Sequence, residues 1–230
     1  MAIGGNEDKR GVQETILGAF VERAGGASAR IVIIPSASEA PRARARTYKR
    51  IFRKLGAAEV AAVHPERGAL SDRERDELRN ATGIFVTGGG QARLMDALRD
   101  TDCVGLIRQA VHRGAVYAGT SAGASAASAT MIAGSDLHGP LEAMEFGEGL
   151  GLIPDVIIDQ HFSERGRLPR LVGATAAYGL TGVGIDENTA IVWTAPGEAL
   201  VKGTGKVTVL DLTNRLHILK DGARIRFIEE

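Results

Sequence analysis

Short apolar runs alternate with longer amphipathic segments through the first two thirds of the chain. This alternation is typical of βαβ units packed around a mainly parallel sheet. The pattern predicts strands at residues 31–35, 58–63, 83–87, 115–118, 156–158 and 182–185, and helices at residues 12–24, 41–55, 72–79, 91–98, 104–113, 121–129 and 168–178. We therefore expect an α/β fold with a doubly wound, mainly parallel sheet and helices on both of its faces.

The pattern changes after Asp186 to short β-rich pieces at residues 190–194, 199–201, 206–211 and 225–228, separated by glycine-containing turns. Such pieces predict an antiparallel, β-rich C-terminal extension of the same domain. With 230 residues, of which 44% are hydrophobic, residues 1–230 are expected to form a single domain.

Charge and cysteine content limit the classes of partner. Lys and Arg total 28, as do Asp and Glu, so no global field favours nucleic acid or an anionic membrane. Cys103 is the single cysteine and cannot form an internal disulfide. Because the first residues show no signal peptide and every apolar run is interrupted by charge or glycine, we expect a cytoplasmic protein without a membrane span.

Ser121 is the candidate nucleophile. It lies in Gly119–Gly123, between the predicted strand at 115–118 and a run of small residues. A serine flanked by small residues at a strand-to-helix junction can occupy a turn too sharp for larger side chains, with its hydroxyl at the edge of a sheet.

His161 is the candidate general base, because it follows the apolar run Val156–Ile158 at a predicted strand end. Surface or structural roles suffice for the other histidines, at positions 64, 112, 138 and 217. The carboxylate that orients His161 can be Glu187 or Asp186, which follow the strand ending at 185; spacing alone leaves the choice open. Asp136 and Glu142 are weaker candidates.

Gly88–Gly90 predicts an oxyanion hole, with one backbone N–H from Gly89 or Gly90 and a second from Ala122. The alternative, phosphate binding in a nucleotide fold, is disfavoured because no Gly-Lys-Ser/Thr follows. Arg165, Arg167 and Arg170 adjoin His161 and suit carboxylate recognition if they face the site, although a solvated helix start explains them equally well. Since ligands collect beyond the carboxyl ends of parallel strands, we expect the loops at 87–91, 119–123 and 159–162 to converge.

Six sequence blocks, taken together, resemble the cyanophycinase family, serine peptidases related to dipeptidase E. The blocks are Gly4–Lys9, Ile33–Ser38, Gly88–Gln91, Gly119–Ala124, Asp159–Phe162 and Gly184–Glu187, and they keep the family order. The resemblance implies a class I glutamine-amidotransferase-like, flavodoxin-like fold and a homodimer. It also implies hydrolysis of cyanophycin, a poly-aspartate that carries arginine on its side-chain carboxyls, to β-aspartyl-arginine dipeptides.

The same resemblance makes Ser121 the nucleophile, His161 the base and Glu187 the orienting acid, with no metal or cofactor. It places substrate-binding positions at Gln91, Asp159, Gln160, Arg165, Arg167 and Arg170. The arginines are expected to hold a substrate backbone carboxylate, and Asp159 with its polar neighbours to meet guanidinium or amide groups.

Two departures from the family pattern bear on function. The chain begins almost at Gly4, which leaves little room for the usual first strand, and Asn6 stands where alanine is common. The chain is also short for the family, so a dipeptidase acting on short α- or β-aspartyl peptides is the alternative to polymer hydrolysis. A non-catalytic binding member of the fold is the alternative from another class.

Overall fold

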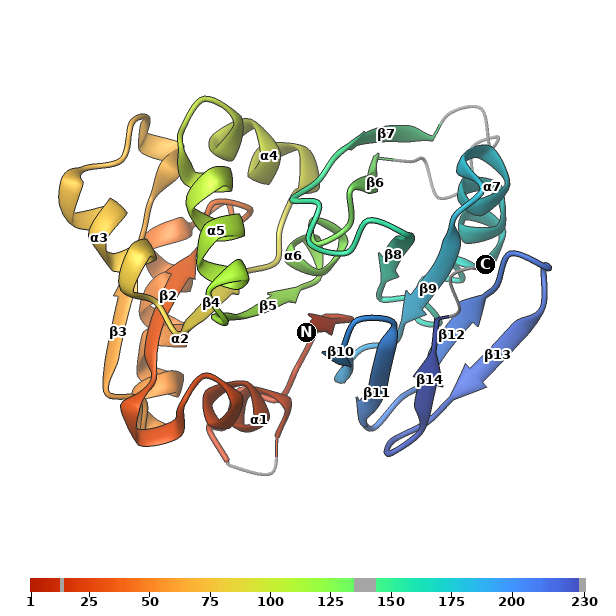
Figure 1. Cartoon of the computed structure of the whole chain (residues 1–230), viewed down its shortest axis with the longest axis horizontal. Coiled ribbons are helices and arrows are strands. Elements are labelled where there is room, and N and C mark those ends of the chain that lie inside the picture. Colours follow the sequence, from red (N-terminus) through yellow and green to blue (C-terminus); the bar gives the residue numbers. More distant parts are fainter. Residues whose placement is uncertain (13–14, 135–143, 228–230) are drawn as a thin grey trace. The chain divides into compact units, whose positions relative to one another are not determined.

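A computed structural model describes residues 1–12, 15–134 and 144–227 of the chain (Figure 1). The chain divides into two compact units, Asp8–Gly123 and Met1–Glu7 with Ala124–Glu230. We call the first the parallel unit and the second the mixed unit, after the strand directions in their sheets. The single domain expected over residues 1–230 stays a prediction.

The parallel unit is built on four parallel strands in the order β5-β4-β2-β3. The strands are β2 (Arg30–Ile34), β3 (Glu59–Ala62), β4 (Gly83–Val86) and β5 (Val116–Thr120). Its helices are α1 (Ile16–Arg23), α2 (Pro41–Lys54), α3 (Asp72–Asn80), α4 (Gln91–Arg99) and α5 (Cys103–His112), with short 3₁₀ helices η1 (Gly26–Ser28) and η2 (Pro65–Arg67). Local signals start several of them, such as the reciprocal Ser71–Glu74 capping box of α3.

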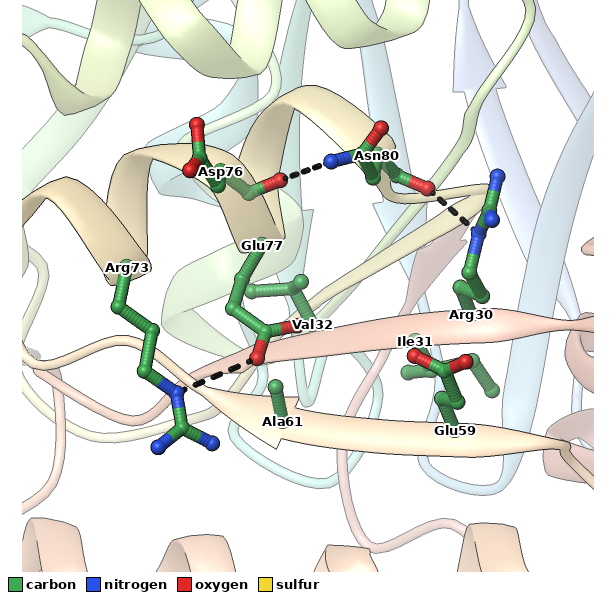
Figure 2. Close-up of a pocket in the computed structure, with 9 residues that line it drawn as sticks. All are labelled: Arg30, Ile31, Val32, Glu59, Ala61, Arg73, Asp76, Glu77 and Asn80. Carbon is green, nitrogen blue, oxygen red and sulfur yellow. Dashed lines mark hydrogen bonds and ion pairs between the residues drawn. The ribbon is translucent and has the colours of Figure 1, made fainter.

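Helices cover both faces of this parallel sheet. On one face Phe85 of β4 packs with Phe20 of α1 and with Tyr48 and Phe52 of α2, at ring-centroid distances of 4.6–5.6 Å from Phe85. Figure 2 shows α3 lying over β2 and β3, with other helices beyond the opposite side of these strands. The predicted doubly wound α/β arrangement is therefore confirmed for this unit.

The described residues of the mixed unit form three sheets. The first has the order β14-β11-β10-β1, formed by β1 (Ala2–Ile3), β10 (Thr189–Ala195), β11 (Glu198–Gly203) and β14 (Arg224–Arg226), and its pairs are antiparallel. The second has the order β13-β12-β9-β8, formed by β8 (Val156–Gln160), β9 (Thr181–Ile185), β12 (Val207–Leu210) and β13 (Leu216–Leu219). The third pairs β6 (Thr130–Gly134) with β7 (Glu145–Glu148).

The second sheet contains the parallel pair β8–β9. The helix α7 (Leu168–Tyr178) connects these two strands and packs Leu171 and Ala174 against Ile157 and Phe162. The remaining pairs of this sheet, β9–β12 and β12–β13, are antiparallel. The predicted β-rich C-terminal extension is therefore confirmed.

One prediction about local structure is wrong. The helix expected at 121–129 is only α6 (Ala122–Ser125), because the next residues bond to the segment after β7: Ala126 O accepts from Leu150 N at 2.7 Å and Ala129 O from Gly149 N at 2.8 Å. These tertiary bonds override the helix propensity of alanine. The first strand is β1, and in keeping with the little room expected for it, it has only two residues, which pair with Ile191 and Ala190 of β10.

Among the helices of the described ranges, none is long and apolar enough to cross a membrane.

Candidate functional site

Ser121 occupies a strained turn in the parallel unit. It lies between the last residue of β5, Thr120, and the first residue of α6, Ala122, and its backbone φ is +52°. Non-glycine residues rarely adopt this left-handed conformation, and such residues cluster at active sites. The small residues around it are required by packing, because a Cβ on Gly123 would lie 2.4 Å from the carbonyl oxygen of Val86. Ser121 thus lies at a tight strand-to-helix turn, the position expected for it from the sequence.

The glycine loop Gly88–Gly90 lies beside this serine. It follows β4, the parallel neighbour of β5, so the carboxyl ends of both strands meet at one sheet edge. A Cβ on Gly88 would lie 3.0 Å from the Cβ of Ser121 and 3.5 Å from its Oγ. The expected convergence of these two loops is confirmed, and glycine at 88 leaves the space beside the hydroxyl open.

The proposed oxyanion donors need one correction. The Gly90 N–H donates to the carbonyl oxygen of Ala37 at 2.9 Å, so this donor is occupied by a backbone bond. Gly89 is exposed, has φ +151°, and its N–H has no partner among the described residues. Ala122 is the first residue of α6, so its N–H has no acceptor within the helix. Gly89 and Ala122 therefore remain the candidate pair.

His161 and Glu187 meet in the mixed unit because they follow neighbouring parallel strands. The last residues of β8 and β9, Gln160 and Ile185, are paired across the sheet. His161 comes directly after β8, and its Nδ1 lies 2.6 Å from Oε1 of Glu187. With Nδ1–H donating to the carboxylate, the neutral imidazole leaves Nε2 as an acceptor.

Asp186 does not share this contact. Its Oδ1 accepts a hydrogen bond from Ser163 N at 3.0 Å and its Oδ2 from Lys206 N at 3.2 Å. The alternative left open by spacing is thus resolved as a contact: Glu187 bonds to His161, whereas Asp186 ties together backbone segments.

The electrostatics of this pair suit a base that is neutral near pH 7. Burial lowers the pKa of His161; the hydrogen bond to Glu187 opposes this effect and the positive charge of Arg165 adds to it. The pKa of Glu187 is lowered chiefly by its hydrogen bond to His161, so the carboxylate stays ionised.

The N-terminal residues hold His161 in place. The His161 backbone N–H donates to the carbonyl oxygen of Gly4 at 2.8 Å, and the residue adopts φ +48°. A Cβ on Gly5 would lie 2.3 Å from Cε1 of the imidazole, so only glycine fits against this ring. Asn6 then donates from Nδ2 to Oε2 of Glu187 at 2.9 Å. Sequence reasoning gave Asn6 no role, although its place directly after the glycine pair was a usable signal.

Asp159 forms a buried cluster with two arginines. Its side chain is 1% exposed, and Oδ1 lies 3.1 Å from Nη1 of Arg167 while Oδ2 lies 2.8 Å from Nε of Arg170. Burial lowers the pKa of Arg167 to about 10. This geometry differs from the expected contact between Asp159 and a substrate guanidinium, because both carboxylate oxygens are already paired with arginine and shielded from solvent.

The other predicted substrate positions fall in different surroundings. Arg165 is exposed, Gln160 is the buried last residue of β8, and Gln91 is the partly exposed first residue of α4. Asp136 and Glu142 lie outside the described residues. Within the described part of the chain, no group of three or more His, Cys, Asp or Glu side chains is arranged to hold a metal ion.

A pocket of about 630 Å³ lies elsewhere in the parallel unit, between α3 and strands β2 and β3 (Figure 2). It is lined by Arg30, Ile31, Val32, Glu59, Ala61, Arg73, Asp76, Glu77 and Asn80. None of the predicted site residues is among them, and its charged side chains are partly paired with one another, as Arg73 is with Glu77 at 3.7 Å.

Comparison with known proteins gives a consistent result. The sequence model of peptidase family S51 matches residues 1–199. A cyanophycinase of Synechococcus elongatus is 42% identical over 251 aligned positions, which cover 96% of this chain and 77% of that protein. A peptidase E of Shewanella amazonensis is 31% identical over 137 positions, or 59% of this chain and 57% of that protein. The crystal structure of a peptidase from an acI-B1 actinobacterium superposes with a TM-score of 0.72 at 23% identity, covering 98% of this chain and 95% of that one.

Proposed function

This chain belongs to peptidase family S51 and is a serine-type peptidase, and we propose that its substrate is cyanophycin, which it hydrolyses to β-aspartyl-arginine dipeptides. The observation that carries this proposal is the 42% identity to a cyanophycinase over 96% of the chain. The proposal agrees with the order of the sequence blocks, which span the serine turn, the glycine loop and the His161–Glu187 pair.

The proposed mechanism assigns one role to each group. Ser121 Oγ attacks the main-chain carbonyl carbon that links successive β-aspartyl-arginine units, while His161 Nε2 takes the hydroxyl proton. Glu187 holds the imidazole through Nδ1 and stabilises the imidazolium. The N–H groups of Gly89 and Ala122 donate to the oxyanion.

The remaining steps return the enzyme to its starting state. His161 gives its proton to the leaving amine, the C–N bond breaks, and the acyl group stays on Ser121. Water then adds to the ester carbon and loses a proton to His161. His161 returns that proton to Ser121 Oγ as the product carboxylate leaves. No metal or cofactor takes part.

The arginines next to His161 are proposed to act on substrate in two ways. Arg165 is exposed and free to meet a substrate carboxylate directly, as a planar bidentate donor. Arg167 and Arg170 are paired with Asp159, so we propose that this buried cluster fixes the conformation of the loop after β8. Gln91 and Gln160 are retained as proposed substrate contacts.

A second candidate substrate class is short α- or β-aspartyl peptides. The similarity to a peptidase E over 59% of the chain favours it. Both substrates demand the same catalytic groups, so the two candidates differ in the length of the peptide and not in the chemistry.

The test is to incubate the purified protein with cyanophycin and with aspartyl dipeptides and to quantify released β-aspartyl-arginine and aspartate by chromatography. We expect β-aspartyl-arginine from the polymer at a higher kcat/KM than any dipeptide gives. The variant Ser121→Ala should lower kcat by about 10⁵- to 10⁶-fold. If only dipeptides are hydrolysed, the substrate is the second candidate class and not the polymer. If Ser121→Ala keeps the full activity, the proposed mechanism is wrong.

We also propose that the enzyme acts in the cytoplasm as a homodimer. The support for the cytoplasm is the single cysteine of this sequence, which cannot form an internal disulfide, and the support for the homodimer is the resemblance to the cyanophycinase family.

A further inference from the structure

The Glu187 carboxylate makes two separate side-chain bonds. Oε1 lies 2.6 Å from His161 Nδ1, and Oε2 accepts from Asn6 Nδ2 at 2.9 Å. Two bonds to different oxygens fix the rotation of the carboxylate as well as its position. Because the Glu187 side chain is 30% exposed, a carboxylate without the second bond would be free to turn toward water.

Asn6 is itself held by the backbone around the pair. It adopts φ +48°, a conformation that asparagine tolerates better than most residues. The preceding Gly5 lies against the His161 ring, and its carbonyl oxygen accepts from Asn188 N at 2.8 Å. The backbone just before Asn6 therefore contacts both loops, the one that carries His161 and the one that carries Glu187.

We propose that Asn6 is a positioning residue of the His161–Glu187 pair, holding the Glu187 carboxylate toward His161 Nδ1–H with a donor that carries no charge. The proposal rests on the proposed catalytic role of His161. A neutral amide N–H stabilises the carboxylate through a hydrogen bond. It adds no positive charge that would repel the imidazolium formed when Ser121 loses its proton.

Other charged groups surround the pair and set the background for a test. Glu164 accepts from Glu187 N through Oε1 at 3.1 Å, and the positive charges of Arg165 and Arg167 lower the pKa of His161. A new negative charge at position 6 would add to the attraction that Glu187 exerts on an imidazolium. The pKa of His161 is therefore expected to rise in Asn6→Asp.

Asn188 supplies a matched control. It is also an asparagine in the left-handed conformation, with φ +46°, and its Nδ2 donates to Thr204 Oγ1 at 3.1 Å rather than to Glu187. Alanine at 6 or at 188 imposes a similar backbone strain. The change at position 6 removes the bond to Glu187 Oε2, whereas the change at position 188 removes the bond to Thr204 Oγ1.

The experiment compares Asn6→Ala, Asn6→Asp and Asn188→Ala in the full chain by steady-state kinetics and by NMR titration of the histidine rings, with His161→Asn used to assign the His161 signal. We expect Asn6→Ala to lower kcat by about tenfold with KM within twofold, because a hydrogen bond to a charged group is lost. Asn188→Ala should stay within twofold of the unchanged protein. Asn6→Asp should raise the pKa of His161 and move the acid limb of kcat/KM upward.

The NMR titration needs no substrate, so it separates this proposal from the proposed function. If the unchanged protein showed no peptidase activity, the catalytic assignment would be wrong, but the effect of Asn6 on the pKa of His161 could still be measured. The proposal is overturned if Asn6→Ala matches Asn188→Ala in kcat, or if Asn6→Asp leaves the titration of His161 where it is in the unchanged protein.

Discussion

The two units offer different kinds of chemistry at their strand ends. In the parallel unit the important features are backbone conformations: Ser121 at φ +52° and Gly89 at φ +151°, with Gly88 leaving space beside the serine. In the mixed unit they are side-chain bonds, from His161 to Glu187 and from Glu187 to Asn6. The glycine loop and Ser121 follow the neighbouring parallel strands β4 and β5, and His161 and Glu187 follow the neighbouring parallel strands β8 and β9.

This difference predicts which kind of substitution disrupts each region. A site made of turns is sensitive to added atoms, because the backbone has no room to move away. A site made of side-chain bonds is sensitive to isosteric changes of charge, because its volume is unchanged while its donors and acceptors are altered. Substitutions that change only charge or only volume therefore separate the two regions.

The largest fall in kcat caused by a change of charge alone is expected for Glu187→Gln in the mixed unit. The amide keeps the volume of the carboxylate but removes the charge that orients Nδ1–H and stabilises the imidazolium. We expect a fall in kcat on the order of 10³- to 10⁴-fold, as for comparable orienting carboxylates. Single-turnover and steady-state assays with the polymer measure it.

Asp186→Asn is the matched control for that substitution. Asp186 accepts from Ser163 N and Lys206 N, so its change should lower the thermal midpoint while kcat of the folded protein stays within a few fold. If both variants lost kcat equally, the assignment of an orienting role to Glu187 and a structural role to Asp186 would be wrong.

Gly89→Ala probes the turn-built region of the parallel unit. A Cβ at this position would lie 1.8 Å from the carbonyl oxygen of Ala37, so the loop must shift and its N–H must move with it. Loss of one oxyanion donor lowers kcat on the order of 10²- to 10³-fold. The measurement is kcat on the polymer, with circular dichroism to establish that the variant is folded.

Gly90→Ala tests whether volume alone is responsible. A Cβ there meets only Arg93 Cβ at 3.6 Å, an ordinary contact, and the φ of Gly90 is −85°. The variant should keep most of its activity. A loss as large as that of Gly89→Ala would show that the loop tolerates no side chain anywhere, and would remove the argument for Gly89 as the donor.

Sequence pattern predicted the strands that are long and buried. The run at 83–87 corresponds to β4 (Gly83–Val86), and the run at 156–158 lies within β8 (Val156–Gln160), because each is a continuous apolar segment. Pattern missed β1, which has two residues, and β13, where Leu216 and Ile218 are exposed and carry no burial signal. β1 depends on pairing with the distant β10 and β13 on pairing with the preceding β12, and no local period encodes either pairing.

The site was predictable to the extent that it depends on strand ends. His161 and Glu187 follow β8 and β9, so the parallel topology alone brings them together. The occupation of the Gly90 N–H by Ala37 and the bond from Asn6 to Glu187 depend on loops 53 and 181 residues apart in sequence, and could not be inferred from spacing.

The smallest expected effect concerns pH and again distinguishes the two units, since the groups in the serine turn and glycine loop do not titrate near neutrality. In the proposed mechanism the active form of His161 is the neutral imidazole, which exists above its pKa, and burial lowers that pKa below the ordinary value of 6.5. Activity should therefore persist on the acid side, with the limb of kcat/KM below pH 6.5.

Arg165→Gln sharpens this last expectation. Removing the positive charge that disfavours the imidazolium should raise the pKa of His161 and move the acid limb of kcat/KM upward. Because Arg165 is exposed, salt screens its charge, so the difference between the variant and the unchanged protein should shrink at high ionic strength. An acid limb above pH 6.5, or one that salt and Arg165→Gln leave in place, would show that the pH dependence arises outside the His161–Glu187 pair.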